Sequence, residues 1–409
     1  MHYLIHPSFK SISILTGAGL VVSVCTVNRA FIIGYIVSLI FLFLLTTNFR
    51  ISIKKYLLIL AGLALTLSGL ITLVKPDSAL GRILIYKISF NVFKENLTGI
   101  GLGKFPVRYN LYQAEYFRAG HYTTKELLLA DNVYYAFNDY WQFIIETGVA
   151  GILLLLFACY CIVLLIYRAL KHNEANNWVK LACAQLIAIS VAALFTHVFE
   201  KSIFQLAVLL ILIYIFLLTN KVKWNIFKYA GVFLLIVLGF MVLKNASYLK
   251  SYKSYIKFEE AKELSKAGFV HESLSALESI YTELQNDAGF LIYYSDELTP
   301  DLSYKQALKV IKHTLTKRSS NILYKKLGDA YFKAGDLYRA ERSYQLAVFM
   351  VPNRFRTKYT LFKYYLLTKR FDNARSIGKL ILNMPVKIPS PEIQQIKYNV
   401  TEELLLNKN

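Results

Sequence analysis

Apolar and polar positions are distributed in two different ways along the 409-residue chain. Up to about residue 243 the apolar residues form uninterrupted runs of roughly 17 to 25 residues, each about long enough to cross a bilayer as a helix. From Lys244 onward charged residues return, and the apolar positions recur with the period of an amphipathic helix. The pattern predicts an all-α fold, in which a polytopic α-helical membrane domain precedes a soluble helical solenoid.

The membrane domain, residues 1–243, is expected to have seven spans and a large loop at 75–142. Basic residues gather in three alternate short connections, of which the one with Arg50, Lys54 and Lys55 is the first. Because such residues favour the cytoplasmic side, the 75–142 loop and everything after Leu243 are predicted to be extracytoplasmic. The expected spans lie near 11–28, 30–47, 57–74, 143–167, 179–199, 203–219 and 226–243.

Composition agrees with a membrane protein, since 56% of the residues are apolar and 18% are charged. The net charge of +21 does not indicate a nucleic-acid-binding protein, because the basic residues form no stripe. All four cysteines fall inside predicted spans, and the seven histidines are scattered. We therefore expect neither a disulfide framework nor a metal site, and no cofactor.

The C-terminal part contains a segment, 321–354, that resembles a tetratricopeptide repeat. In such repeats small residues let two helices approach, large residues fill the space between them, and a proline ends the second helix. We expect a stem at 244–254, about four repeats over 255–388 and a C-terminal tail at 389–409. The array is expected to bind a protein partner in its concave face. The signature positions are Tyr324, Leu327, Gly328, Tyr331, Ala340, Tyr344, Ala347 and Pro352.

The loop at 75–142 is the expected place of the chemistry, because it is too long for an ordinary connection and too apolar to stay disordered. Its first half, from Arg82 to Phe93, predicts a helix along the membrane surface. Three glycines then alternate at 99, 101 and 103. They allow either a close backbone approach to a phosphate or a tight turn after the helix.

Four motifs in this part resemble, in order and spacing, the O-antigen ligase and polymerase superfamily of bacterial membrane glycosyltransferases. They are NRAFIIGY at 28–35, GRILIYK at 81–87, FKENLTGIGLGKF at 93–105 and FNDYWQFIIETGVAG at 137–151. The resemblance covers about residues 20–220. It implies an undecaprenyl-pyrophosphoryl glycan as donor, an acceptor hydroxyl at the outer face, and a place in the bacterial inner membrane in lipopolysaccharide biosynthesis.

The resemblance also implies that Arg29 and Arg82 bind the donor's pyrophosphate, with Gly101 and Gly103 as backbone contacts. Physical chemistry agrees, because a guanidinium forks onto phosphate oxygens and stabilises charge on a leaving group. The alternative is that each arginine is an interfacial anchor or a topology signal.

The fourth motif departs from the family, which commonly has His-Asn where this chain has Phe137 and Asn138. Phenylalanine cannot accept a proton, so either another base acts or the chain is inactive. Asp139 is the first candidate base, although it also fits an ordinary acid at a helix N-terminus, as Asn138 fits a helix cap. The further candidates for the catalytic site or the acceptor contacts are Glu146, Asp131, His121, Tyr135 and Tyr140, with His197 and Glu200 at an outer turn as additions.

Two other functions stay open at this point. The chain begins only about one span ahead of the NR motif, whereas family members usually carry several, so it is a candidate for a truncated or split ligase. A non-catalytic membrane anchor that presents the repeat array to an envelope complex is the other. A transporter is disfavoured, because the spans lack paired charges and helix breaks.

Overall fold

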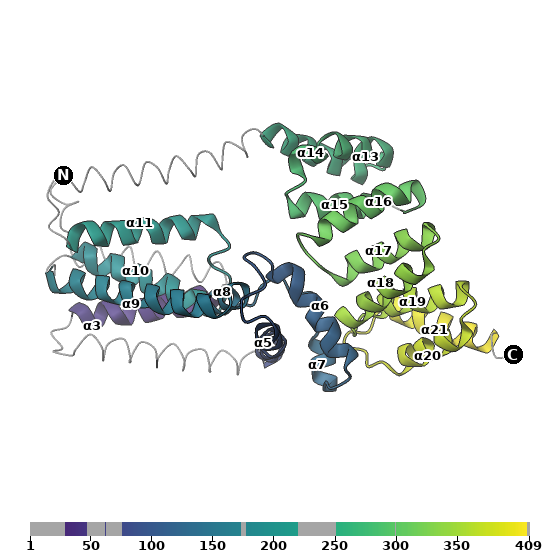
Figure 1. The fold of residues 1–409 in the computed structure, drawn as a ribbon, viewed down its shortest axis with the longest axis horizontal. Helices are drawn as coiled ribbons and strands as arrows, with labels where there is room; N and C mark the ends of the chain where they lie inside the picture. The colour runs from purple at the N-terminus through teal and green to yellow at the C-terminus, as the bar shows by residue number, and fades with distance from the viewer. Residues whose placement is uncertain are drawn as a thin grey trace. The chain divides into compact units, whose positions relative to one another are not determined.

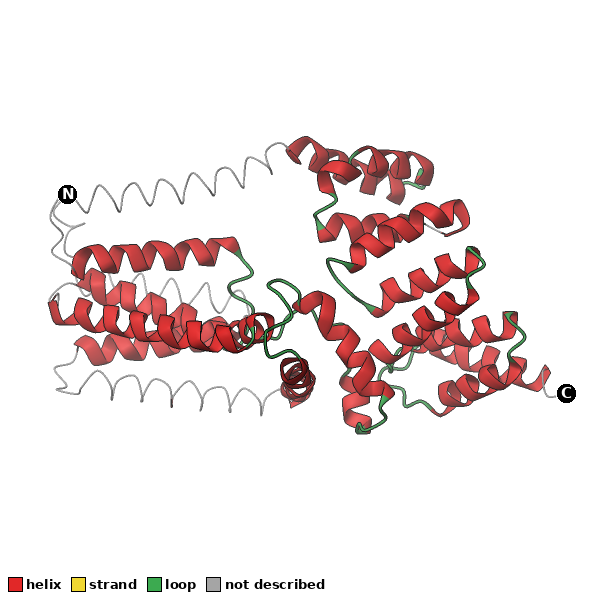
Figure 2. Cartoon of the chain, viewed as in Figure 1, coloured by secondary structure: helices red, strands yellow, loops and turns green. Residues whose placement is uncertain are grey.

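The computed structural model describes residues 29–46, 62, 76–172, 177–219, 251–298 and 300–406. In these residues every regular element is a helix (Figure 2), which confirms the all-α class. The chain divides into two compact units. One contains Met1–Arg82, Phe93–Leu102 and Tyr135–Met241, and the other contains Ile83–Val92, Gly103–Tyr134 and Val242–Asn409.

The described part of the first unit is built from four apolar helices and the short helix α8, Asp139–Thr147. The four helices are α3 (Arg29–Thr46), α9 (Val149–His172), α10 (Asn177–Ala193) and α11 (Ser202–Thr219), which run side by side in Figure 1. They enclose one apolar core. Its fully buried members include Val37, Phe41, Ala169, Cys183 and Ile215.

Helices α3 and α10 approach each other closely at a glycine of the NRAFIIGY motif. A Cβ atom on Gly34 would lie 2.3 Å from the carbonyl oxygen of Ala188. The neighbouring Ala192 is fully buried at the same contact. Small residues of this kind let two apolar helices pack backbone to backbone, so the motif's glycine has a structural reason.

One described helix, Val149–Lys171, is long and apolar enough by length and composition to cross a membrane. Ala30–Leu45, Asn177–Ala193 and Ser202–Leu217 are shorter apolar helices. The expected spans 11–28 and 226–243, and nearly all of 57–74, lie outside the described residues. The seven-span topology and its orientation therefore stay predictions.

The expected span 143–167 is two helices rather than one. Helix α8 ends at Thr147, and Gly148 follows with φ of 70° before α9 begins at Val149. The apolar run continues across this break, so hydropathy alone did not reveal it. The break lets α8 end beside the glycine-rich turn described below.

The second unit combines part of the long loop with the C-terminal helices. The loop contributes α6 (Phe105–Arg118), α7 (Thr124–Leu129) and the middle of α5 (Pro76–Glu95), which confirms the predicted helix at 82–93. Residues 251–266 are also helical. The helices that follow are α13 (Val270–Ser279), α14 (Tyr281–Leu284), α15 (Ala288–Glu297), α16 (Pro300–Leu315), α17 (Asn321–Lys333), α18 (Leu337–Met350), α19 (Phe355–Leu367), α20 (Phe371–Asn383) and α21 (Pro391–Leu406).

These C-terminal helices stack as successive antiparallel pairs (Figure 1). In the pair α17–α18, a Cβ atom on Gly328 would lie 2.6 Å from the ring of Tyr344, and Ala340 and Ala347 are fully buried. The signature residues thus do pack two helices closely, as predicted. Membership of the tetratricopeptide family itself stays a prediction. Residues 391–406, within the predicted tail, form a helix whose Ile396 and Val400 join the core of the last pairs.

The loop segment of the second unit is docked on the C-terminal helices by buried polar groups. The amide nitrogen of Asn110 donates to the carbonyls of Val133 and Ser319, at 3.1 and 2.8 Å. The amide nitrogen of Asn353 donates to the carbonyls of residues 127, 128 and 130 at the end of α7. Between them Ala114 of α6 packs against Met350 and Val351. The loop is therefore an integral part of this unit.

Candidate functional site

Helix α8 begins at the fourth motif. Asn138 is its N-cap, and the side-chain oxygen accepts a hydrogen bond of 3.0 Å from the backbone N–H of Trp141. Such a cap satisfies one of the free N–H groups at the start of a helix. Phe137, directly before the cap, has φ of 54°, a left-handed conformation that is rare for a bulky residue. The start of α8 is thus a capped helix preceded by a strained residue.

Asp139 holds the turn between α10 and α11. One carboxylate oxygen, Oδ2, accepts hydrogen bonds from the backbone N–H groups of Val198 and Phe199, at 2.7 and 3.0 Å. Burial raises the pKa of Asp139 to about 6, while these two N–H groups act in the opposite direction by stabilising the carboxylate. The acid therefore fixes the position of residue 197, which lies just before the two donors.

His197 and Arg82 meet on the ring of Phe137. The guanidinium carbon of Arg82 lies 5.5 Å from the centre of this ring, and the imidazole of His197 meets the ring edge-on at 6.0 Å. The imidazole also stacks face to face on Tyr135, with 4.1 Å between ring centres and 8° between planes. Phe137 thus stands where the family commonly has a histidine, and the side chain of His197 contacts its ring.

The Nδ1 atom of His197 is buried and has no hydrogen-bond partner among the described residues. Buried polar atoms are almost always paired, so an unpaired imidazole nitrogen in an otherwise ordered cluster requires a reason, such as a catalytic role or a bound water. An imidazole is also a group that can accept a proton near neutral pH.

The side chain of Gln142 also holds the turn between α10 and α11. The amide nitrogen of Gln142 donates to a carboxylate oxygen of Glu200 at 3.2 Å, and its amide oxygen accepts from the backbone N–H of Ala136 at 3.1 Å. Gln142 is 7% exposed. Sequence reasoning did not single it out, although its place three residues after Asp139 on an N-capped helix puts it near the same helix face.

The alternating glycines form a turn packed against the end of α8. The backbone N–H groups of Ile100 and Gly101 donate to the carbonyls of Ile145 and Glu146, at 3.2 and 2.9 Å. The Gly101 amide is therefore engaged within the fold, and the contact of Gly101 and Gly103 with a pyrophosphate stays a prediction. The other alternative, a tight turn after a helix, is the one the geometry favours.

Two glycines make this approach possible. A Cβ atom on Gly99 would lie 2.4 Å from the carbonyl oxygen of Glu146, and one on Gly148 would lie 2.1 Å from that of Leu97. Glu146 itself is on α8, is 7% exposed and has partners in the fold. Tyr140, also on α8, donates its hydroxyl to the carbonyl of Ser190 at 3.0 Å, which is a structural contact.

The remaining predicted residues are described by the unit to which each belongs. Asp131, His121 and Gly103 belong to the second unit. Asp131 is exposed and forms an ion pair of 3.0 Å with Arg354, and His121 is exposed in the segment between α6 and α7. The backbone of Arg29 starts α3, but its side chain lies outside the described residues. The predicted pyrophosphate contact by Arg29 therefore stays a prediction.

Metal chemistry has no visible site in the described ranges. Among these residues no group of three or more histidine, cysteine, aspartate or glutamate side chains is placed to hold an ion. The chemistry of the cluster is that of a cation and an imidazole held against aromatic rings, with a carboxylate bonded to the backbone beside the imidazole. Such a set can bind an anion and accept a proton.

Comparison with known proteins gives one family. Residues 14–156 match the family model described as O-antigen ligase, and a search of curated proteins finds no match. The matched range contains all four motifs and ends at residue 156, short of the limit near 220 that we expected; His197 lies beyond it. This family implies a lipid-linked glycan as substrate and a place in the bacterial inner membrane. The match supports placing residues 14–156 in the O-antigen ligase superfamily, and with it an enzyme of the membrane glycosyltransferase type.

Proposed function

We propose that this protein transfers a glycan from undecaprenyl pyrophosphate to an acceptor hydroxyl at the extracytoplasmic face of the inner membrane. The observation that carries the proposal is the cluster around Phe137, in which Arg82 and Phe137 lie within the range that matches the O-antigen ligase family and His197 lies beyond it. The cluster combines a guanidinium with an imidazole, which are the two groups that a transfer from a pyrophosphate to a hydroxyl requires. The seven-span topology belongs to the same proposal.

On the donor side, Arg82 binds the pyrophosphate, and Arg29 is its expected companion at the start of α3. The Arg82 guanidinium lies over the Phe137 ring, which orients it by a cation–π contact. A guanidinium stays charged at any physiological pH and presents a fork of N–H donors to phosphate oxygens. It therefore stabilises the charge that grows on the leaving pyrophosphate.

On the acceptor side, His197 is the base and Asp139 is a positioning residue. The imidazole of His197, whose Nδ1 has no partner among the described residues, accepts the proton of the acceptor hydroxyl, and the hydroxyl oxygen forms a bond to the anomeric carbon. The bond from that carbon to the pyrophosphate oxygen breaks, and its electron pair leaves with undecaprenyl pyrophosphate. A single displacement of this kind inverts the anomeric configuration. Asp139 acts through the backbone of 198 and 199 and touches no substrate.

The experiment is a comparison of two variants in a strain whose surface glycan depends on this gene. His197→Gln removes the base, whereas Asp139→Asn keeps an oxygen that can accept the two backbone hydrogen bonds. We expect His197→Gln to abolish transfer and to accumulate the lipid-linked glycan, and Asp139→Asn to retain a substantial part of the activity. The matched control is His271→Gln, an exposed histidine of α13, which should transfer normally.

Two results would overturn this assignment of roles. Normal glycan attachment by His197→Gln, at normal protein level, would show that the imidazole is not the base. Complete loss in Asp139→Asn with retained activity in His197→Gln would return the role of base to Asp139, our first candidate from the sequence.

We also propose that residues 255–388 are tetratricopeptide repeats, and that the segment bound to them is helix α6 of the loop at 75–142. Buried contacts of Asn110 and Gln113 join α6 to the carbonyls of Ser319 and Met350. A face that is already filled by α6 is not open to a separate protein. A protein partner would therefore have to use another surface of the array.

A further inference from the structure

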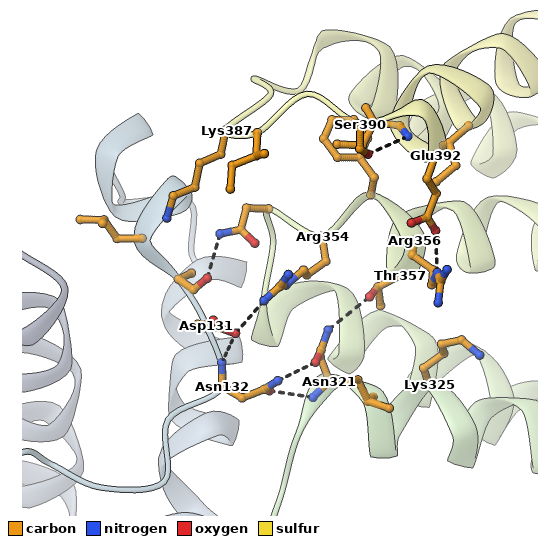
Figure 3. Close-up of a pocket in the computed structure, with 18 of the residues that line it drawn as sticks. Asp131, Asn132, Asn321, Lys325, Arg354, Arg356, Thr357, Lys387, Ser390 and Glu392 are labelled. Atoms are coloured by element: carbon orange, nitrogen blue, oxygen red, sulfur yellow. Dashed lines mark hydrogen bonds and ion pairs between the residues drawn. The ribbon is translucent and has the colours of Figure 1, made fainter. Parts of the chain in front are cut away.

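A pocket of about 830 Å³ opens in the second unit, between the end of the docked loop and the C-terminal helices (Figure 3). The loop contributes residues 129–132, and the helices contribute the beginnings of α17 and α19 together with residues 387–396. The volume is that of a drug-sized or oligosaccharide-sized site. None of the candidate catalytic groups apart from Asp131 lines it.

The lining is cationic. Five basic side chains stand against two carboxylates, which leaves a net charge of +3 at pH 7. Lys325 and Lys326 have carboxylate partners outside the lining, Asp329 and Asp296. Lys387 donates to the carbonyl of Leu128, a neutral partner. The remaining two basic side chains are Arg354 and Arg356.

Two arginines are held in the pocket by exposed ion pairs. Arg354 contacts Asp131 at 3.0 Å, and Arg356 contacts Glu392 at 2.7 Å. All four side chains are more than half exposed. Ion pairs of this exposure contribute only about 0–1 kcal/mol, so an incoming anion can replace the carboxylates at little cost. The two guanidiniums are therefore preset to accept a bidentate anion.

Neutral hydrogen-bonding groups lie beside the arginines in Figure 3. Asn132 and Asn321 bond to each other through their side chains at 2.8 Å, and Asn321 also donates to the hydroxyl of Thr357 at 3.3 Å. Ser390 completes the set. Amides and hydroxyls with spare lone pairs suit the many hydroxyl groups of a sugar.

A peptide is the alternative anionic ligand. Peptides that bind helical arrays place apolar anchors in a groove along a helix face. The corresponding face of α17 and α18 is occupied by α6, whose Ala114 packs on Met350 and Val351. The pocket at the helix starts places its charged and amide groups beside aliphatic side chains, with Phe355 as its one aromatic residue. The larger aliphatic members of the lining are Leu129, Ile322, Ile388, Ile393 and Ile396.

We infer that this pocket binds an oligosaccharide segment that carries carboxylate groups, with Arg354 and Arg356 on the carboxylates and the asparagines on the hydroxyls. It is a glycan-binding site separate from the transfer chemistry. Binding there requires no donor and no catalytic base, so the inference fails or holds independently of the proposed function.

The test is direct binding by fluorescence anisotropy, with the purified full-length protein in detergent micelles. The probes are labelled tetragalacturonate and a labelled hyaluronan tetrasaccharide, with maltotetraose as the uncharged sugar and end-blocked tetraglutamate as the acidic peptide. The variant is Arg354→Gln/Arg356→Gln, and a second variant is Lys387→Gln. The matched control is Arg339→Gln, an exposed arginine of α18 outside the pocket.

We expect at least one acidic sugar probe to bind with a Kd below about 1 mM, which is an ordinary affinity for a few charge-assisted hydrogen bonds. The double variant should weaken binding about tenfold or more and Lys387→Gln about threefold, whereas Arg339→Gln should leave it unchanged. Absence of binding by both acidic sugars would overturn the inference, as would equal binding to the double variant. Equal binding of maltotetraose would also overturn it, because the ligand would then need no charge. Equal binding of tetraglutamate would overturn it too, because the ligand would then need no sugar.

Discussion

Replacing Gly148 with alanine tests the junction that joins the glycine turn to α8 and α9. The residue has φ of 70°, and the added Cβ would lie 2.1 Å from the carbonyl oxygen of Leu97 and 2.5 Å from the amide nitrogen of Gly99. Both obstacles are backbone atoms, so no side chain can rotate away. The turn must instead move by about 1 Å to restore an ordinary contact distance of roughly 3 Å or more.

The cost follows from the contacts that such a shift breaks. Gly148 has ψ of −150° as well as positive φ, a conformation found almost only in glycine, and an alanine held there costs about 1–3 kcal/mol. Three backbone hydrogen bonds join the turn to the helices, namely Val149 to Leu97 at 2.9 Å, Ile100 to Ile145 at 3.2 Å and Gly101 to Glu146 at 2.9 Å. At about 0.5–1.5 kcal/mol each, their loss brings the expected destabilisation to about 3–7 kcal/mol.

The assay is unfolding of the purified protein in detergent, followed by circular dichroism and by transfer activity. The matched control is Gly120→Ala, because Gly120 has φ of 80° and open space around its Cβ position. Only the conformational cost of about 1–2 kcal/mol applies there. If the two variants lose the same free energy of unfolding, the packing argument for the glycine turn is refuted.

Three further predictions concern other parts of the molecule. Asn353→Ala removes hydrogen bonds to the carbonyls at the end of α7, and should cost about 1–3 kcal/mol and speed amide hydrogen exchange in 120–132; unchanged exchange would contradict the docking. Burial lowers the pKa of Lys358 to about 8, so the stability of the protein should rise as pH rises from about 8 to 10.5; Lys358→Met should add at most about 3 kcal/mol at pH 7 and remove that slope. Asp139 should change the stability in the opposite direction. Its pKa is raised to about 6, so the folded protein keeps the proton of this carboxyl group to a higher pH than the unfolded protein does. Stability should therefore fall as pH rises from about 4 to 6, and an Asp139→Asn variant that kept this fall in thermal unfolding scans would refute the cause assigned to it.

Local sequence patterns were sufficient for features that depend on neighbours in the chain. The predicted helix over 82–93 is part of α5, and the alternative that Asn138 caps a helix and Asp139 opens it is what the structure has. The small residues at Gly328 and Ala340 do lie between two helices. Each of these follows from helix period, capping preference or side-chain size within a short segment.

Contacts between distant segments were not predictable in the same way. The sequence left two interpretations of the turn at 99–103. Its amides bond to the carbonyls of Ile145 and Glu146 at the end of α8, which is more than forty residues further along the chain. His197 was only an addition to the candidate list, since nothing near it in sequence indicates the ring of Phe137. The docking of α6 and α7 on the C-terminal helices depends on Asn110 and Asn353, which are unremarkable residues in the linear sequence.

The most direct measurement of the central claim is transfer of a radiolabelled glycan from undecaprenyl pyrophosphate by purified Arg82 variants. Arg82→Lys keeps the charge but loses the fork, and should lower kcat/KM about tenfold or more, because charge-assisted bidentate contacts are stronger than single ones. Arg82→Ala should lower it further, while Lys94→Ala on the same helix α5 should have little effect. Transfer by Arg82→Ala at the rate of the unaltered protein would contradict the account.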